Sequence, residues 1–384
     1  MKPIRVLHLI NNLGSGGAQR QLLELVRGLD GERVESLIAM YDPVHFFEGD
    51  PRYAEIPVRI LERRHRGDPR MVGRLQNLLR AEEVDILHAW LVVPGIWAWL
   101  AARGVPGTRL ICTELSDASQ GPMLWTLARK LTFPRADLVM ANSHRATAII
   151  AEEHGLAPER LAAIHNGIDV PHWSANAPST PAVENALEKL PKDGIRIVMV
   201  GSFHRWKDHA MLIRALRRIG DRAPIHVVLI GAAVHPEVLV DTERAIQEAG
   251  LSERVIRMEA MSDLRALHQH MDALVLTSRF EGLPNVVLEA MTAGLPVLAT
   301  DVSDLRQLIT DGQEGWVVPV GDDEALADRL MRFARLSVEE RGAMRSHARR
   351  LGATFTVDQM ASDTLKCYEQ MMRRPPIRAP RRKA

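Results

Sequence analysis

Short apolar runs alternate with amphipathic helical patterns along almost the whole chain of 384 residues. This alternation predicts βαβ units, in which parallel strands are joined by helices that cover the sheet. In the first half, we expect strands at Ile4–Ile10, Val34–Met40, Ile86–Leu87, Leu110–Thr113, Leu138–Ala141 and Leu161–Ile164, with a first helix at Ala18–Leu29. In the second half, we expect strands at Ile195–Val200, His226–Ile230, Val255–Met258, Ala273–Leu276 and Val297–Ala299, and helices at Lys207–Arg218, Pro236–Glu248, Asp263–His270 and Asn285–Ala293. The expected fold class is α/β, with doubly wound parallel sheets.

Length and composition indicate two domains of ordinary size. A chain of this length exceeds one typical core, and 46% hydrophobic and 25% charged residues are usual for a globular protein. Residues 171–194 begin with a stretch rich in proline, serine and alanine, so we expect a linker there. Residues 1–170 and 195–356 are then expected to form two Rossmann-like domains.

Charge and cysteine usage narrow the class of protein further. The net charge of +1 gives no overall field that would indicate nucleic acid. The two cysteines, Cys112 and Cys367, form neither a metal motif nor a redox motif, which fits a reducing cytoplasm. The N-terminal apolar run is short for a signal peptide, and we find no apolar stretch of transmembrane length. We therefore expect a cytoplasmic protein.

Residues 277–296 carry the most specific motif of the chain. The apolar run Ala273–Leu276 leads into a polar turn with a glycine and a proline, and a helix is expected from Asn285. Glu281 falls in the turn, and Glu289 falls about one turn into the helix. In a doubly wound domain, ligands bind at such junctions, outside the carboxyl ends of the strands. The N–H groups at a helix start can hold a phosphate, and carboxylates can accept hydrogen bonds from sugar hydroxyls. This layout suits a nucleotide sugar.

The same stretch resembles the E-x7-E signature of the family-4 (group 1) glycosyltransferases, which have the GT-B fold. Glu281, Gly282, Pro284, Asn285 and Glu289 follow in the order of that signature, before Gly-Leu-Pro-Val. The resemblance covers nearly the whole chain and is strongest from residue 200 to residue 315. It implies two Rossmann-like domains facing across a cleft, with the acceptor-side domain at residues 1–170 and the nucleotide-sugar domain at residues 195–356.

The resemblance also implies an order for the C-terminal part of the chain. In the GT-B plan the last helix crosses back onto the first domain, and here that helix is expected at residues 357–372. The segment 373–384 has six basic residues and three prolines. We expect it to be a disordered basic tail.

A glycine-rich loop follows the first expected strand. Glycines at this place allow the backbone to approach an anion closely, and the next helix points its N-terminus toward it. A dinucleotide site is the rival interpretation, but the spacing is not G-x-G-x-x-G and no acidic residue ends the second strand. Gly16 and Gly17 instead resemble the Gly-Gly-Ala-Glu/Gln loop of the family, which faces the donor diphosphate and the acceptor. A simple tight turn is the other alternative.

The second domain opens with a strand, a loop and a lysine at the expected start of a helix. Lys207 could neutralise a diphosphate and so stabilise the leaving nucleotide. The family places an arginine where this chain has Ser202, so we expect Arg205 to reach the phosphate instead. A solvated helix lysine and a solvated arginine remain the simpler interpretations.

The resemblance implies roles for individual residues. Glu281 would contact the donor sugar, and Glu289 would contact the ribose. The side chain of Lys207 would hold the diphosphate together with backbone groups of the helix start. These backbone groups belong to the expected donor-binding residues Gly282, Leu283, Pro284, Asn285 and Val286.

Several positions either match the family without a catalytic role or depart from it. Asn166 and Gly167 resemble the Pro-Asn-Gly turn of the family, which we interpret as a structural tight turn with φ > 0. Ser143 is expected to cap a helix. His88 stands at the first position of a His-x-His motif, and Trp90 replaces the second histidine. We expect a satisfied strand-end histidine and a core tryptophan, with sugar stacking as the alternative. Gln307 replaces a frequent glutamate.

The sequence also indicates whether the reaction needs a metal or a cofactor. We find no Asp-x-Asp motif and no histidine or cysteine cluster with ligand spacing, so no metal and no cofactor are expected. The expected function is transfer of a sugar from a UDP- or GDP-linked donor to a glycan or lipid-linked acceptor, with retention, in cell-surface polysaccharide synthesis. A GT-B nucleotide-sugar epimerase and a non-catalytic nucleotide-sugar-binding protein remain alternatives.

A basic segment suggests a further partner. Residues 59–80 contain seven arginines and only two acids, Glu62 and Asp68. One interpretation is a solvated helix face. The other is contact with anionic lipid headgroups at the inner face of the membrane, supported by the basic tail.

Overall fold

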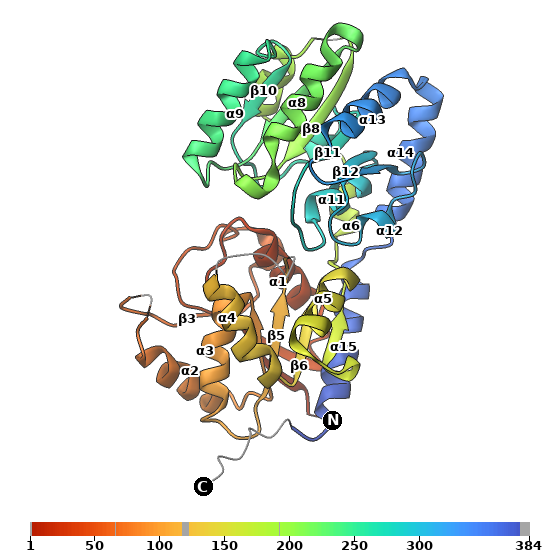
Figure 1. Cartoon of the computed structure of the whole chain (residues 1–384). Helices are drawn as coiled ribbons and strands as arrows, with labels where there is room; N and C mark the ends of the chain where they lie inside the picture. Colours follow the sequence, from red (N-terminus) through yellow and green to blue (C-terminus); the bar gives the residue numbers. More distant parts are fainter. Residues whose placement is uncertain (1, 66, 117–122, 192, 377–384) are drawn as a thin grey trace. The chain divides into compact units, whose positions relative to one another are not determined.

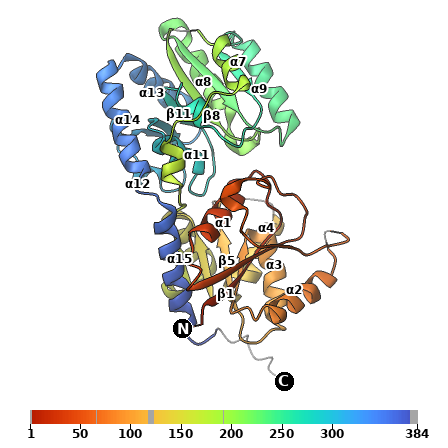
Figure 2. The same ribbon diagram turned by 180° about the vertical axis from the view of Figure 1, so that it is seen from behind.

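The computed structural model of the protein describes residues 2–65, 67–116, 123–191 and 193–376. The chain divides into two compact units. The first contains Met1–Gly167 and Thr356–Ala384, and the second contains Ile168–Phe355. Figures 1 and 2 show both units from opposite sides, each with a twisted sheet between helices.

The first unit is built on a seven-stranded sheet in which all pairs are parallel. Its strands are β1 (Ile4–Ile10), β2 (Val34–Met40), β3 (Val58–Ile60), β4 (Ile86–Trp90), β5 (Arg109–Glu114), β6 (Leu138–Ala141) and β7 (Leu161–Ala163). Their order in the sheet is β3-β2-β1-β4-β5-β6-β7. The helices are α1 (Gly17–Gly28), α2 (Arg70–Ala81), α3 (Val92–Ala102), α4 (Met123–Thr132), α5 (His144–His154) and α15 (Val357–Met372).

Alternation along the strands supplies two apolar layers to this unit. On β1, Val6 and Ile10 pack with α1 and α15, while Leu7 and Leu9 pack on the opposite face with α2 and α3. Both faces of the sheet are therefore covered, as a parallel sheet requires.

The second unit repeats the same plan with a six-stranded parallel sheet. Its strands are β8 (Ile195–Val200), β9 (Ile225–Ile230), β10 (Val255–Met258), β11 (Ala273–Leu276), β12 (Val297–Thr300) and β13 (Gly315–Val318), in the order β10-β9-β8-β11-β12-β13. Its helices are α6 (Val170–Ser174), α7 (Pro181–Lys189), α8 (His209–Ile219), α9 (Pro236–Glu248), α10 (Arg265–His268), α11 (Asn285–Thr292), α12 (Leu305–Leu308), α13 (Asp323–Arg335) and α14 (Val338–Gly352). Short 3₁₀ turns include η4 (Arg205–Lys207) and η5 (Gly220–Arg222). The predicted fold class, two Rossmann-like doubly wound units, is confirmed.

Helix α15 belongs to the first unit although it ends the described chain (Figure 1). Two glycines allow its close approach. A Cβ on Gly28 would lie 2.5 Å from Cγ1 of Val357, and one on Gly167 would lie 2.8 Å from the Cα of the same valine. Gln21 fixes Gly167 further, because its side-chain amide exchanges two hydrogen bonds of 3.0 Å with the glycine backbone.

The interpretation of Asn166-Gly167 as a positive-φ turn is wrong. Neither residue is among those with positive φ. The glycine is needed because α15 and its preceding backbone leave no room for a side chain, with the oxygen of Thr356 only 2.9 Å from an ideal Cβ. Crowding between elements distant in sequence explains this position, where turn chemistry was expected.

Other local expectations also shift. The segment expected as a linker carries α6 and α7 and packs into the second unit, where Trp173 and Val183 are buried. Strands β3 and β13 were not predicted. Helix α8 begins at His209 rather than Lys207, because the Asp208 side chain accepts a hydrogen bond from the Met211 N–H and caps the helix there. Of the expected basic tail, residues 377–384 lie outside the described residues.

Ser143 has the predicted role, since its side chain accepts a hydrogen bond from the Ala146 N–H at the start of α5. Among the described residues, none of the helices combines the length and the apolar character needed to cross a bilayer.

Three buried histidines make stability depend on pH. Burial lowers the pKa of His8 to about 3 and the pKa values of His209 and His268 to about 4, from an ordinary value of 6.5. Neither ring nitrogen of His268 has a hydrogen-bond partner among the described residues. Its ring lies 5.9 Å from that of Trp173. Each histidine is therefore neutral in the folded protein near pH 7.

We expect the unfolding free energy to fall as the pH drops from 7 to 4. The pKa of these histidines is lower in the folded state, so the unfolded chain takes up protons first below pH 6.5. Each group contributes a slope of at most about 1.4 kcal/mol per pH unit. His268→Leu should flatten the pH dependence of the melting temperature, whereas His270→Leu, at an exposed position, should leave it unchanged. Equal pH dependence of both variants would contradict this explanation.

Candidate functional site

The pairing of β8 with β11 defines a crevice in the second unit. Strands β9 and β10 lie on one side of β8 within the sheet. The chain then returns to β11, which pairs with β8 on its other side. The loops after β8 and β11 therefore leave the sheet in opposite directions. In doubly wound sheets this reversal of strand order is where ligands bind, outside the carboxyl ends of the strands.

The loop after β8 places a lysine at this reversal. Residues 205–207 form the 3₁₀ turn η4, and Asp208 follows with a φ of 44°. Gly201 lies under the lysine stem, since an ideal Cβ there would be 3.3 Å from Cδ of Lys207. The side chain of Lys207 is 23% exposed. The ammonium group is thus held at the end of β8 and can still be reached by solvent.

The loop after β11 places a carboxylate against the same lysine. The Nζ of Lys207 forms an ion pair with Oε1 of Glu281. The Ser278 hydroxyl donates a hydrogen bond of 2.7 Å to the same oxygen. Glu281 is 15% exposed, so the pair is partly desolvated and stronger than a surface ion pair. The structure brings together two residues that are 74 positions apart in sequence.

Hydrogen bonds hold the two loops together. The Thr277 hydroxyl, which is fully buried, donates to the backbone oxygens of Lys207 and Asp208 at 2.9 and 3.0 Å. The Arg279 N–H donates to the oxygen of Trp206, and its guanidinium donates to the Asp208 carboxylate at 2.9 Å. This arrangement fixes the backbone under the ion pair and leaves freedom only at its polar ends.

Helix α11 begins directly after this loop. Pro284 is its N-cap residue and provides no side-chain cap. Gly282, Leu283 and Pro284 are buried, while Asn285 and Val286 are partly exposed in the first turn. The N–H groups of a first helical turn have no intrahelical partner and favour anions. Further along the helix, the side chain of Glu289 is 2% exposed.

Of the remaining predicted site residues, one lies in the second unit and two lie in the first. The guanidinium of Arg205 is 77% exposed and lies 4.0 Å from Glu237 of α9. Gly16 and Gly17 are at the start of α1, in the first unit. A Cβ on Gly16 would lie 2.3 Å from Oε1 of Gln19, so this glycine leaves room for a side chain of its own helix.

In the first unit, a polar network surrounds His88 of β4. The Nδ1 of His88 is 2.8 Å from the Tyr368 hydroxyl, and its Nε2 contacts Oγ1 of Thr113. The Trp90 N–H donates to Nδ1 of His8 at 3.2 Å. Burial lowers the pKa of His88 well below its ordinary value. Both ring nitrogens of His88 are thus used within the fold, and Trp90 is buried, in agreement with the expectation for these two residues.

A small cavity of about 30 Å³ adjoins this network. Its polar lining includes Gln21, His88, Thr113, Asn142 and Asn166. The space accommodates about two water molecules. The cavity is therefore too small for a sugar as the first unit stands.

Sequence reasoning missed the residues that position the ion pair. Thr277, Ser278, Asp208 and Arg279 all act through hydrogen bonds between the two loops. Ser278 carried a usable signal, since it is a polar residue at the carboxyl end of a buried strand. The αL conformation of Asp208 had no signal in the sequence beyond the preference of aspartate for helix N-caps.

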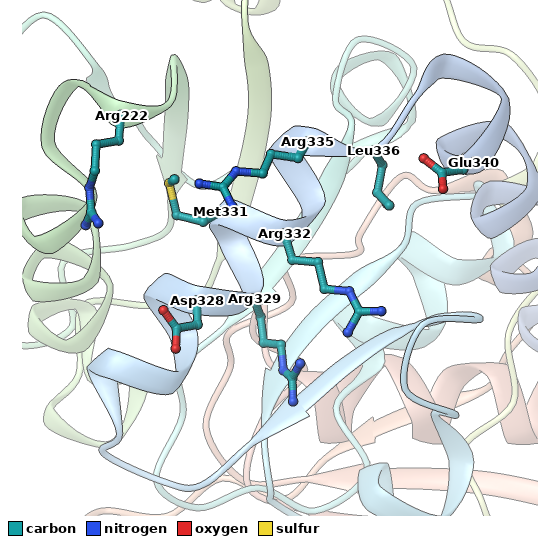
Figure 3. Close-up of a pocket in the computed structure, with 8 residues that line it drawn as sticks. All are labelled: Arg222, Asp328, Arg329, Met331, Arg332, Arg335, Leu336 and Glu340. Atoms are coloured by element: carbon teal, nitrogen blue, oxygen red, sulfur yellow. The ribbon is translucent and has the colours of Figure 1, made fainter.

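The second unit contains a larger hollow, of about 540 Å³. Figure 3 shows its lining side chains, which include Arg329, Arg332 and Arg335 of α13 and Arg222 of η5. The second half of a helix that follows a parallel strand runs back toward the amino edge of the sheet, and η5 directly precedes β9. The hollow therefore lies at the edge opposite to the Lys207–Glu281 pair, and we do not assign the ligand site to it.

Solved structures with a similar fold identify the fold class of this chain. The crystal structure of HepE from Anabaena in complex with UDP and glucose superposes with a TM-score of 0.82 at 20% identity, covering 96% of this chain and all of that one. The sucrose-phosphate synthase of Thermosynechococcus elongatus gives a TM-score of 0.74 at 19% identity, covering 96% and 99%. The chain thus has the GT-B fold, as the sequence predicted.

Family models and curated relatives define the family. Residues 15–171 match the model described as Glycosyltransferase Family 4, and residues 194–335 match Glycosyl transferases group 1. The chain is 25% identical over 374 residues to the N-acetylgalactosamine-N,N'-diacetylbacillosaminyl-diphospho-undecaprenol 4-alpha-N-acetylgalactosaminyltransferase of Campylobacter jejuni, covering 93% of this chain and 97% of that one. It is 25% identical to the D-inositol 3-phosphate glycosyltransferase of Xylanimonas cellulosilytica, covering 95% and 94%.

The chain belongs to the family-4 (group 1) glycosyltransferases. It is a glycosyltransferase that acts on nucleotide-sugar donors. The epimerase and the non-catalytic binding protein are not supported by these relatives, which are transferases.

The partial burial of the Lys207–Glu281 pair predicts a measurable coupling. In a double-mutant cycle with Lys207→Met and Glu281→Gln, we expect an interaction free energy of about 1–2 kcal/mol, obtained from denaturant or thermal unfolding. The pair Lys366–Asp363, with side chains 60% and 35% exposed, is a matched control and should give about 0.5 kcal/mol or less. Equally small couplings for both pairs would show that the site lysine is solvated.

Proposed function

We propose that this glycosyltransferase moves a hexose from a UDP- or GDP-linked donor to a glycan or lipid-linked acceptor, with retention at the anomeric carbon. The observation that carries the proposal is the contact of Lys207 with Glu281 at the reversal of strand order. A cation and a carboxylate on rigid loops at this place suit the two halves of a nucleotide sugar, a diphosphate and a sugar with hydroxyl groups.

Lys207 is the proposed partner of the donor diphosphate. The ammonium is already held by Glu281, so a diphosphate that reaches it adds negative charge to a preorganised cation. Charge on the leaving phosphate increases as the glycosidic bond breaks, and a fixed cation stabilises that charge most in the transition state. The first turn of α11, with Gly282 to Val286 before and within it, would share the remaining negative charge.

Glu281 is the proposed contact of the donor sugar, and the buried Glu289 is the proposed contact of the ribose. Each carboxylate can accept hydrogen bonds from two hydroxyls. Ser278 and Lys207 fix one oxygen of Glu281, so Oε2 stays available for the sugar. Arg205 is proposed as a further phosphate contact, because its guanidinium is 77% exposed and its contact with Glu237, at 4.0 Å, is weak. Gly16 and Gly17 are proposed donor-binding residues of the first unit.

Retention follows if the leaving phosphate assists the acceptor. In this reaction the bond between the anomeric carbon and the phosphate oxygen breaks, and the acceptor oxygen forms its bond on the same face. The acceptor proton moves to an oxygen of the leaving phosphate. The residues above then bind, orient and neutralise charge, and no protein nucleophile takes part.

The proposed setting is cell-surface polysaccharide synthesis at an anionic membrane surface, without a metal. The Campylobacter relative is named for a diphospho-undecaprenol substrate, which is lipid-linked. In the basic segment, Arg63 pairs with Asp42 at 2.6 Å and Arg74 lies 3.7 Å from Asp68. Exposed arginines such as Arg64 and Arg70 remain for headgroup contact.

We expect Glu281→Gln and Glu289→Gln to lower turnover by about a hundredfold, since each keeps the shape and removes the charge. The melting temperature of the Glu281 variant should fall by no more than the few degrees that loss of the ion pair with Lys207 costs. Glu253→Gln, at an exposed position of the same unit, is the control and should be neutral. Initial rates with a panel of UDP- and GDP-linked sugars measure this. Wild-type rates in both site variants would refute the assignment, and a loss of stability that parallels activity would indicate a structural role.

We expect Lys207→Ala to lower kcat by more than it weakens donor binding, because its charge acts mainly in the transition state. Lys189→Ala, at an exposed position, should change neither quantity. EDTA should leave the wild-type enzyme active. Inhibition by EDTA that magnesium reverses would refute the metal-free diphosphate site, and equal losses in kcat and affinity would place Lys207 in ground-state binding.

A further inference from the structure

Helix α4 of the first unit exposes most of its large apolar side chains and buries an arginine. Its apolar side chains Met123, Leu124, Leu127 and Leu131 are 79%, 68%, 47% and 44% exposed. Its Arg129 is only 1% exposed. A surface helix of a globular protein normally turns its apolar face to the core and its charges to water. The exposure of these apolar side chains therefore needs an explanation.

A buried ion pair fixes this orientation. The Nε of Arg129 donates a hydrogen bond of 2.7 Å to Oε2 of Glu114, at the end of β5, and Glu114 is 2% exposed. The Ser116 hydroxyl donates to the other carboxylate oxygen at 2.6 Å. Separation of such a pair would leave an uncompensated buried charge, which is costly. The helix cannot rotate to hide its leucines without that cost.

The four exposed side chains form one continuous face, which we call the α4 face. At 100° per residue, positions 123, 124, 127 and 131 fall within about 100° of the helix circumference. Single exposed apolar residues are ordinary, but a clustered face indicates an interaction surface. Helix α3 packs beside α4 (Figure 1).

Cations lie on α4 and near its C-terminal end. Lys130 lies at the edge of the α4 face and is exposed, and α4 contains no acidic residue. Arg135 donates a hydrogen bond of 2.7 Å to the Leu131 oxygen. The guanidinium carbons of Arg135 and Arg103 lie 5.4 and 5.5 Å from the ring centre of Trp99 on α3. An apolar face, a tryptophan and nearby cations together match the requirements of a helix that lies in a membrane interface.

We propose that the α4 face inserts into the interfacial layer of an anionic lipid membrane. This inference rests on the membrane partner proposed above and gives it a contact surface separate from the basic segment at residues 59–80. Charge complementarity favours this occupant over a second copy of the chain. In a twofold interface the same patch faces itself, so Lys130, Arg103 and Arg135 would oppose like charges. Anionic headgroups would instead neutralise them.

Cosedimentation with vesicles tests the proposal. The probes are vesicles of phosphatidylcholine, with and without phosphatidylglycerol, in the absence of donor and acceptor. We expect the full chain to bind the anionic vesicles and Leu124→Gln/Leu127→Gln to bind at least about tenfold more weakly, because each leucine loses its transfer from water. The control, Val234→Gln/Val240→Gln, changes two residues of the second unit that are 58% and 52% exposed and should bind normally.

Salt separates insertion from adsorption by charge. Exposed charges are screened within about 3 Å at 1 M salt, so binding through the basic segment should disappear there. Binding through the α4 face should persist in part. Lys130→Gln should weaken binding at low salt and have little effect at high salt.

Two results would overturn the proposal. The first is wild-type binding by the leucine variant with an unchanged melting temperature. The second is a dimer in sedimentation velocity that this variant converts to monomer without any change in vesicle binding, since the α4 face would then join two copies. Vesicle binding uses neither donor nor turnover. Failure here would therefore leave the transfer reaction intact, and failure of the Glu281 and Lys207 predictions would leave membrane binding intact.

Discussion

The direct pairing of β8 with β11 controls where chemistry can occur in the second unit. Parallel strands all present their carboxyl ends at one edge, and the reversal of strand order separates two loops there. Thr277 then ties the loops together through the backbone oxygens of Lys207 and Asp208. Because the Thr277 side chain is fully buried, the loss of these hydrogen bonds would leave its hydroxyl unsatisfied, which opposes separation of the loops. The opposed charges of Lys207 and Glu281 are consequently a result of topology, and the same topology leaves their outer side open to solvent.

Polar groups in the two units serve different ends. In the first unit, His88, Tyr368 and Thr113 satisfy one another and connect β4 and β5 to α15. These three side chains use their polar groups within the fold and stabilise the position of α15. In the second unit, the Lys207–Glu281 pair keeps an exposed side. The contrast explains why the charged crevice of the second unit, and not the histidine cluster, is the better candidate for donor chemistry.

The sequence predicted the strands well, because fully buried parallel strands are continuous apolar runs whose ends are marked by polar residues. Ile4–Ile10, Ile195–Val200 and Ala273–Leu276 were predicted with their observed bounds. Helix ends were harder, since the start of α8 depends on the cap at Asp208. The close approach of α15 to Gly167 and the contact of Lys207 with Glu281 join residues far apart in sequence. Local pattern carries no information about such contacts, so the ion pair itself could not be predicted from either loop.

Helix α4 shows most clearly where pattern reasoning stops. Its periodicity is that of an ordinary amphipathic helix, and the usual rule would bury the leucines. The rule fails because Arg129 must meet Glu114, and only the fold shows that this carboxylate lies buried at the end of β5. The ion pair would be a poor source of stability, since a hydrophobic replacement of similar volume is often neutral or better. Its value is orientation: it holds an apolar face outward that burial would otherwise remove. If the α4 face binds the proposed membrane, its leucines are transferred from water to lipid. The free energy of that transfer would offset the desolvation cost of the Arg129–Glu114 ion pair.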